Sequence, residues 1–138
     1  MQLKIKLDEG AFPISHANDE AAGIDLRTPK TVCVWPNSYT SVDTGVHVEI
    51  PKGYCGLLVS KSGLNIKHGI QTTGLIDSDY RGSIVVGLYN FSSDSYIFEK
   101  GQKITQMVVM PYEKCDIVQV DTLSETDRGD KGFGSTGK

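Results

Sequence analysis

The segment 77–82 places two carboxylates, Asp77 and Asp79, on either side of a serine and follows them with Tyr80. A carboxylate is ionised at neutral pH and can take a proton from water, so this pair is a candidate general base beside a tyrosine-lined pocket. An extended segment would point both acids to one side, whereas a turn would aim them apart. An acidic turn whose carboxylates accept backbone hydrogen bonds is the structural alternative.

The C-terminal residues 127–138 contain four glycines together with Arg128 and Lys131. Glycine lets backbone N–H groups approach an anion closely, and the arginine fork matches phosphate oxygens. Phe133 stands alone among the glycines, where it suits stacking on a flat ring better than packing in a core. A mobile terminus is the alternative for this composition.

Three further clusters carry polar residues in positions of interest. Lys61 precedes Ser62 and Gly63, and this combination of cation, hydroxyl and glycine suits either an oxyanion site or a solvated loop. Asp25 lies between apolar neighbours and is either a structural hydrogen-bond acceptor or part of a cation site. Gln106 falls on an expected strand, where its amide must satisfy the backbone or contact a ligand.

Alternation of apolar and polar residues dominates the chain and predicts strands. It is clearest in 2–7 and 46–50, and further strands are expected at 31–35, which is rich in β-branched residues, and at 54–60, 83–91, 104–110 and 117–120, separated by turns rich in Gly, Asp and Ser. In the first of these, the alternation predicts that one face is buried. Only 62–67 suggests a helical turn. We therefore expect a single all-β domain of sandwich, barrel or jelly-roll type.

Composition narrows the possible partners. The 138 residues carry a net charge of −3, which argues against a broad nucleic-acid surface. The sequence holds no apolar run long enough to span a membrane and no signal peptide, so we expect a cytoplasmic protein. The cysteines are odd in number and widely spaced, which argues against a disulfide framework or zinc site and favours small buried side chains, at Cys33, Cys55 and Cys115. The histidines form no metal-binding pair, and we expect structural roles for them.

Taken in order, the clusters resemble the five motifs of the trimeric dUTPases. They read AAGIDL (21–26), SKSGL (60–64), GLIDSDYRG (74–82), GQKITQ (101–106) and RGDKGFGSTG (128–137). The resemblance implies a distorted β jelly roll (β-clip) that forms a homotrimer with exchanged C-terminal arms. Residues 1–138 would form one domain, with 127–138 as a flexible arm that closes over an active site shared between subunits.

The implied reaction is the hydrolysis of dUTP to dUMP and pyrophosphate, which limits uracil in DNA and supplies dUMP for thymidylate synthesis. Mg²⁺ would be held mainly by the triphosphate, and Asp25 would hold a water on it. Asp77 would activate the water that attacks the α-phosphorus, and Tyr80 would pack on the deoxyribose. The remaining substrate-binding residues implied are Lys61, Ser62, Gly63, Gln71, Gly74, Leu75, Ile76, Val85, Gln106, Arg128, Phe133, Gly134, Ser135 and Thr136.

Two alternative functions are dCTP deamination and nucleotide binding without catalysis. The dCTP deaminases share the fold but place a glutamate on the strand after the hairpin, where this sequence has Gly87. A non-catalytic nucleotide-binding or regulatory protein would not need the carboxylate at Asp77, although a regulatory protein partner remains open as a second role. The sequence departs from the family at Lys61, where an arginine is usual and a bidentate contact is lost, at Lys131 and at Thr105.

Overall fold

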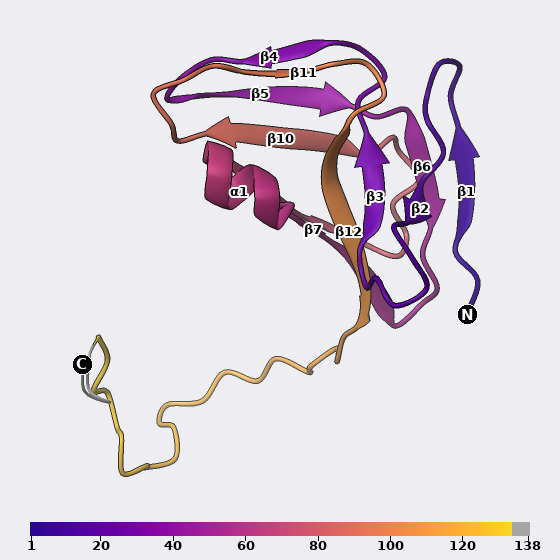
Figure 1. The fold of residues 1–138 in the computed structure, drawn as a ribbon. Coiled ribbons are helices and arrows are strands. Elements are labelled where there is room, and N and C mark those ends of the chain that lie inside the picture. Colours follow the sequence, from indigo (N-terminus) through magenta and orange to yellow (C-terminus); the bar gives the residue numbers. More distant parts are fainter. Residues whose placement is uncertain (134–138) are drawn as a thin grey trace.

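The computed structural model describes residues 1–133, and its regular elements are strands, most of them short, with one helix at the side of the molecule (Figure 1). In chain order the elements are β1 (Lys4–Leu7), β2 (Ser15–His16), β3 (Ile24–Arg27), β4 (Val32–Val34), β5 (Ser38–Asp43), β6 (Val46–Glu49), β7 (Tyr54–Val59), α1 (Ser62–His68), β8 (Ile70–Gln71), β9 (Thr73–Ile76), β10 (Val85–Asn90), β11 (Tyr96–Phe98) and β12 (Lys103–Pro111). The all-β architecture expected from the alternation is confirmed.

The strands form four antiparallel sheets. The largest has the order β2-β3-β12-β7-β9, and a second has the order β5-β10-β8. Two further pairs are β1 with β6 and β4 with β11. The nine-residue β12 is the central strand of the largest sheet, and its pairing with β3 shifts register between Lys103 and Thr105. This layout is the distorted jelly roll, with β12 linking strands that are far apart in the sequence.

The core lies between these sheets and follows the alternation of the strands. On β6, Val46 and Val48 are buried while His47 and Glu49 face outward. On β10, Val86 and Leu88 are completely buried and alternate with exposed neighbours. Burying each such side chain contributes roughly 1.5–3 kcal/mol, so the alternation fixes which face of each strand meets the core.

The single helix begins at the predicted position. Lys61 has extended backbone angles and precedes the first turn of α1, which confirms the helical segment expected at 62–67. The helix ends at Gly69, whose φ of 64° is the left-handed conformation that glycine adopts readily. Leu64 packs its side chain against the core, which anchors α1 beside β8.

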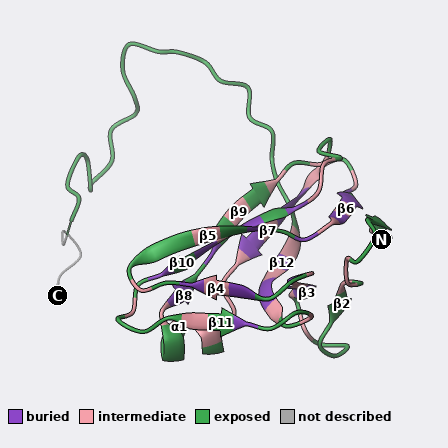
Figure 2. Ribbon diagram, turned by 90° about the horizontal axis from the view of Figure 1, so that it is seen from above, coloured by how far each residue is buried: buried purple, intermediate pink, exposed green. Residues whose placement is uncertain are grey.

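After β12 the chain leaves the body of the molecule. Residues 112–133 form no helix or strand and are exposed along their whole length, as the burial colours show (Figure 2). The exposed segment thus begins at Tyr112, before the arm expected at 127. Within residues 1–133, the helix α1 is not long and apolar enough to cross a membrane.

Two expectations about the strands were wrong. The segment 117–120 is not a strand, because it runs away from the body and no described strand lies beside it to complete its hydrogen bonds. The predicted buried face of the first strand is largely open, with Ile5 42% and Leu7 36% exposed. The physical reason is that β1 pairs with β6 alone, at the edge of the fold. The expectation of buried cysteines was also wrong for Cys115, which is exposed, and for Cys33, which is only half-buried, whereas Cys55 is buried as expected.

Candidate active site

The central strand β12 brings three separate sequence clusters together. Gln106 pairs with Asp25 of β3 on one side and with Val59 of β7 on the other. Lys61 lies two residues after the end of β7. Asp25, Lys61 and Gln106 therefore lie close in space because their strands are neighbours, although the sequence separates them widely.

Asp25 forms a buried ion network with two lysines. Its neighbours on β3, Ile24 and Leu26, belong to the core, and its own side chain is only 2% exposed. Lys61 Nζ lies 2.5 Å from Asp25 Oδ1, and Lys103 Nζ lies 2.5 Å from Oδ2. Burial raises the pKa of the Asp25 carboxyl, but the hydrogen bonds and charges of Lys103 and Lys61 outweigh it and hold that pKa below its usual value. The network has one negative and two positive charges.

Gln106 is held in place by the backbone of an adjacent motif. Its Nε2 donates a hydrogen bond to the carbonyl oxygen of Ser60, at 3.3 Å. Its Oε1 lies against Gly23, where any side-chain carbon would collide with it. Gly23 is thus required for close approach, which explains why the 21–26 cluster contains a glycine at this position.

Lys61, Lys103 and Gln106 line one cavity of about 370 Å³. The lining residues are Lys61, Ser62, Gly63, Leu64, Lys67, His68, Tyr96, Lys103 and Gln106. Three of them are lysines, and no carboxylate of the described chain is among them. Because Asp25 offsets one of the three charges, the cavity keeps a positive excess that suits a polyanion such as a polyphosphate.

Besides the apolar Leu64, sequence reasoning missed four residues that line this cavity. Lys103 lies within the GQKITQ cluster, three positions before Gln106, so its charge was a signal that could have been used. Lys67 and His68 come from the last turn of α1, which the helical expectation for 62–67 could have brought toward Ser62. Tyr96, on β11, carried no sequence signal for this role.

Asp77 lies at a different cavity of the same chain. It follows β9 and lines a space of about 660 Å³ with Ser78, Asp79, Arg81 and other residues, but it does not line the lysine-rich cavity. The segment is a turn rather than a strand. Within residues 1–133 the side chains of Asp77 and Asp79 accept no hydrogen bond, so the alternative of carboxylates satisfied by backbone N–H groups is not realised.

The residues before this turn pack closely, but β9 pairs with β7 whereas β10 pairs with β5 and β8, so the two strands do not form the expected hairpin. Gly74 of β9 faces Leu58 of β7, where an added Cβ would lie 3.2 Å from Leu58 Cδ1. Leu75 is exposed and Ile76 is half-buried. The Tyr80 ring covers Gly82, and its hydroxyl donates a hydrogen bond to the carbonyl oxygen of Ser83 at 3.0 Å.

Gln71 and Val85 occupy separate places. Gln71 on β8 pairs with Tyr89, and its Nε2 donates to Asn65 Oδ1 at 3.1 Å. Val85 lies four residues earlier on β10, opposite Asp43, and is 52% exposed. A single chain therefore does not gather these two side chains into one pocket with Tyr80.

The arm residues are exposed in the described part of the chain. Arg128 Nε donates to the carbonyl oxygen of Lys131 at 3.0 Å, within a local turn. Phe133 is fully exposed and touches no core. The predicted phosphate-covering residues Gly134, Ser135 and Thr136 lie outside the described residues.

The structure also bears on a divalent metal. Mg²⁺ prefers carboxylate, phosphate and water oxygens, and both oxygens of Asp25 are already engaged by ammonium groups. No cluster of three potential ligands from His, Cys, Asp and Glu occurs among residues 1–133. The donor set therefore does not fit a resident ion held by the chain alone. It is compatible with an ion that arrives on a polyphosphate.

Comparison with known proteins gives consistent matches. The dUTPase family model matches residues 11–137. The deoxyuridine 5'-triphosphate nucleotidohydrolase of Nautilia profundicola is 43% identical over 142 residues, covering 100% of both chains. That of Escherichia phage T5 is 40% identical and covers 98% of both.

Solved structures agree with these matches. The dUTPase of Staphylococcus bacteriophage 80alpha with dUpNHpp superposes with a TM-score of 0.91 at 30% identity, covering 99% of both chains. A variant dUTPase of phage phi11 of S. aureus, described with a structural Mg(II) ion, gives a TM-score of 0.81 at 26% identity, over 88% of this chain and 98% of the other.

Proposed function

The chain belongs to the dUTPase family, and we infer that it hydrolyses dUTP to dUMP and pyrophosphate. The reaction is the attack of water on the α-phosphorus of the nucleotide. The bond from that phosphorus to the oxygen bridging to the β-phosphate breaks, and pyrophosphate leaves. The enzyme is accordingly a dUTP diphosphatase.

The observation that carries the proposal at the level of residues is the lysine-rich cavity. Lys61 and Lys103 are fixed by Asp25, while Gln106 is fixed by Ser60. Cations held in place before the substrate arrives do not have to reorganise as charge develops on the phosphates. We propose that this cavity binds the triphosphate, with Ser62 and Gly63 donating to its oxygens.

Asp77 is proposed as the general base. Its side chain is exposed and forms no hydrogen bond with residues 1–133, so its carboxylate is free to contact water. It would accept the proton of the attacking water while the oxygen bonds to the α-phosphorus. Mg²⁺, entering with the substrate, would neutralise charge on the triphosphate.

Selectivity is proposed to come from the segment 74–82. The backbone of Gly74, Leu75 and Ile76 would pair with the edge of uracil, since a segment with little side-chain bulk can approach a base closely. Tyr80 would pack on the sugar and leave no room for a 2′-hydroxyl. A wall at this place rejects thymine by its methyl group and cytosine by mismatched donors and acceptors. We keep Gln71 and Val85 as proposed parts of this pocket.

We further propose that the working site is shared among three copies of the chain. The separation of Asp77 from the lysine-rich cavity supports this, because the base and the phosphate site would meet only between subunits. The exposed segment 112–133 supports an arm that reaches a neighbouring subunit, bringing Arg128 and Phe133 over the nucleotide. The three free thiols are consistent with a proposed cytoplasmic location.

The test is pyrophosphate release measured side by side with dUTP, dCTP, dTTP and UTP, with ammonia assayed in parallel. We expect release from dUTP alone. Release of ammonia from dCTP would identify a deaminase, and binding of dUTP without turnover would identify a non-catalytic nucleotide-binding protein. Light scattering should give a mass of three 15.0 kDa chains. A monomer that turns over dUTP would overturn the shared site.

A further inference from the structure

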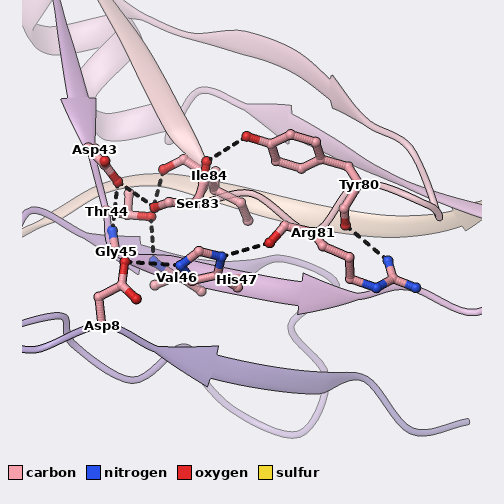
Figure 3. Close-up of polar contacts among 10 residues, drawn as sticks. All are labelled: Asp8, Asp43, Thr44, Gly45, Val46, His47, Tyr80, Arg81, Ser83 and Ile84. Carbon is pink, nitrogen blue, oxygen red and sulfur yellow. Dashed lines mark hydrogen bonds and ion pairs between the residues drawn. The ribbon is translucent and has the colours of Figure 1, made fainter.

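His47 lies between two hydrogen-bond acceptors that belong to different parts of the chain (Figure 3). It is on β6, with a side chain that is 19% exposed. Its Nδ1 lies 2.8 Å from the carbonyl oxygen of Arg81, in the turn that follows Asp77. Its Nε2 lies 3.0 Å from Oδ2 of Asp8, just after β1. The imidazole therefore bridges the edge strand and the turn.

The chemistry of the two partners fixes the protonation state that this geometry needs. A carbonyl oxygen and a carboxylate oxygen only accept hydrogen bonds. A neutral imidazole has one N–H group and can donate to only one of them, whereas the imidazolium donates to both. Both contacts are complete only when His47 is protonated.

The surroundings favour that state. The carbonyl of Arg81 and the carboxylate of Asp8 raise the pKa of His47 above its ordinary value, although partial desolvation and Lys6 oppose them. Lys6 is the residue paired with His47 across β1 and β6, and Lys4 is paired with Glu49 at 2.8 Å. The charged groups around the ring are Lys4, Lys6, Asp8, Asp43, Glu49 and Arg81.

The turn that His47 contacts is stiff within itself. Arg81 Nη1 donates to the carbonyl oxygens of Ser78 at 2.7 Å and of Tyr80 at 3.0 Å. The N–H group of Tyr80 donates to the carbonyl oxygen of Asp77 at 3.2 Å. A displacement of Arg81 is therefore passed to Asp77 and Tyr80, because these internal bonds make the turn move as a unit.

The far end of the turn is fastened by groups that need no proton from His47. Ser83 Oγ donates to the Asp43 carboxylate, and Thr44 Oγ1 donates to the carbonyl oxygen of Ile84 at 2.7 Å. The N–H group of Ile84 donates to the carbonyl oxygen of Val46 at 2.8 Å. The bond from His47 to Arg81 thus ties β6 to the residue whose guanidinium group holds the carbonyl oxygens of Ser78 and Tyr80.

We propose that protonated His47 is a positioning residue for dUTP hydrolysis: it anchors the turn through Arg81 and so holds Asp77 in its working place. Loss of the proton removes one of the two bonds that tie the turn to the edge strand, and turnover falls. The inference rests on the proposed function, since it assigns Asp77 as the base, but the anchor itself can be measured without turnover.

The first test is the pH profile of kcat with saturating dUTP. A reaction that needs only an ionised carboxylate keeps its rate as pH rises. We expect wild-type kcat to fall above the pKa of His47 measured by NMR, by about tenfold, which is the effect of losing one hydrogen bond to a charged group. His47→Gln should show this lower kcat at all pH values and lack the alkaline decrease. An unchanged profile in His47→Gln would overturn the proposal.

A second variant keeps the imidazole. Asp8→Asn removes the carboxylate that favours the imidazolium, so the alkaline decrease in kcat should move to lower pH together with the NMR pKa of His47, while the plateau at lower pH stays. His16→Gln is the matched control, because His16 is exposed on β2, and its profile should equal that of wild type. A decrease in kcat that stays in place in Asp8→Asn contradicts the role of His47.

The anchor and the function can fail separately. The carbonyl carbon shift of Arg81 should titrate with His47 in wild type and stay constant in His47→Gln, whether or not dUTP is hydrolysed. No titration of that carbon with His47 refutes the anchor. Titration in a protein without dUTP turnover at any pH keeps the anchor and rejects the proposed function.

Discussion

Asp25 Oδ1 lies 2.5 Å from Lys61 Nζ, and this ion pair joins β3 to the residue that precedes α1. Lys103 Nζ contacts the other carboxylate oxygen, also at 2.5 Å. A buried carboxylate that holds two ammonium groups links β3 to β12 and arranges the wall of the lysine-rich cavity at the same time. The sequence alone left two roles for Asp25, a hydrogen-bond acceptor or part of a cation site. The structure shows a carboxylate that contacts two ammonium groups and holds them in place.

The variant Asp25→Asn tests this arrangement. It leaves two ammonium groups around a neutral amide, so the free energy of unfolding should fall by about 3 kcal/mol, at the lower end of what a broken buried pair costs because both lysines are partly exposed. Urea denaturation measures the change. Lys61→Arg, which keeps the charge, is the control and should fold and turn over dUTP. A collapse of its activity would show that the ammonium itself is required.

The same variant should change the response to acid. The folded-state pKa of Asp25 is lowered, so its contribution to stability is present above its unfolded value of 3.8 and is lost as pH falls through the lower folded value. Wild type should therefore lose stability in that range, and Asp25→Asn should lose less there. Equal losses in the two proteins would mean that Asp25 is not stabilised as an anion.

Asp77→Asn tests the base. The amide keeps the size of the side chain but cannot take a proton from water, so kcat should fall by roughly a hundredfold to ten-thousandfold. Calorimetric binding of a non-hydrolysable dUTP analogue should be nearly unchanged. Asp79→Asn is the matched control, since Asp79 lines the same cavity and should keep most of the activity. A strong effect in Asp79→Asn with none in Asp77→Asn would exchange the two roles.

The sequence predicted the strands well where burial is decided within the chain. Val46, Val48 and Ile50 alternate with polar residues, and all three are buried in the core because alternate side chains of a strand point to the same face. The same pattern failed at Ile5 and Leu7, because an edge strand has no second layer over its apolar face. Periodicity shows which residues share a face but not what covers that face.

The candidate site shows a similar division. The five clusters indicated Lys61 and Gln106, and both line the cavity. The contact of Lys103 with Asp25 depends on the pairing of β3 with β12, which neither segment shows by itself. The bridge through His47 was missed for the same reason: its partners come from β1 and from the 77–82 turn, and no local pattern connects them.

Lys67→Gln tests the residue that the cavity adds to the sequence motifs. Lys67 lines the cavity without an ion-pair partner among residues 1–133, so its charge is free to meet the polyphosphate. The KM for dUTP should rise by about tenfold, roughly the loss of one charge-assisted contact, with a smaller change in kcat. Lys100→Gln, at an exposed lysine between β11 and β12, is the control and should leave KM unchanged.

Deleting residues 128–138 separates the arm from the fold. The described part of this segment is exposed and makes no core contact, so Tm should change by less than about 4 °C. If the arm closes over the nucleotide, kcat/KM should fall by about a hundredfold, the order that lost positioning costs. A large decrease in Tm with retained activity would contradict the arm as a lid.

Mixing two inactive variants tests whether subunits share the site. Asp77→Asn supplies an intact arm, and the chain without 128–138 supplies an intact Asp77. If base and arm come from different subunits, equal mixing after unfolding and refolding should restore activity at about one quarter of the sites, because half of the bases and half of the arms are intact. Each variant refolded alone is the control. Base and arm taken from the same chain cannot complement each other in this way, so a mixture that stays inactive would place both in one subunit.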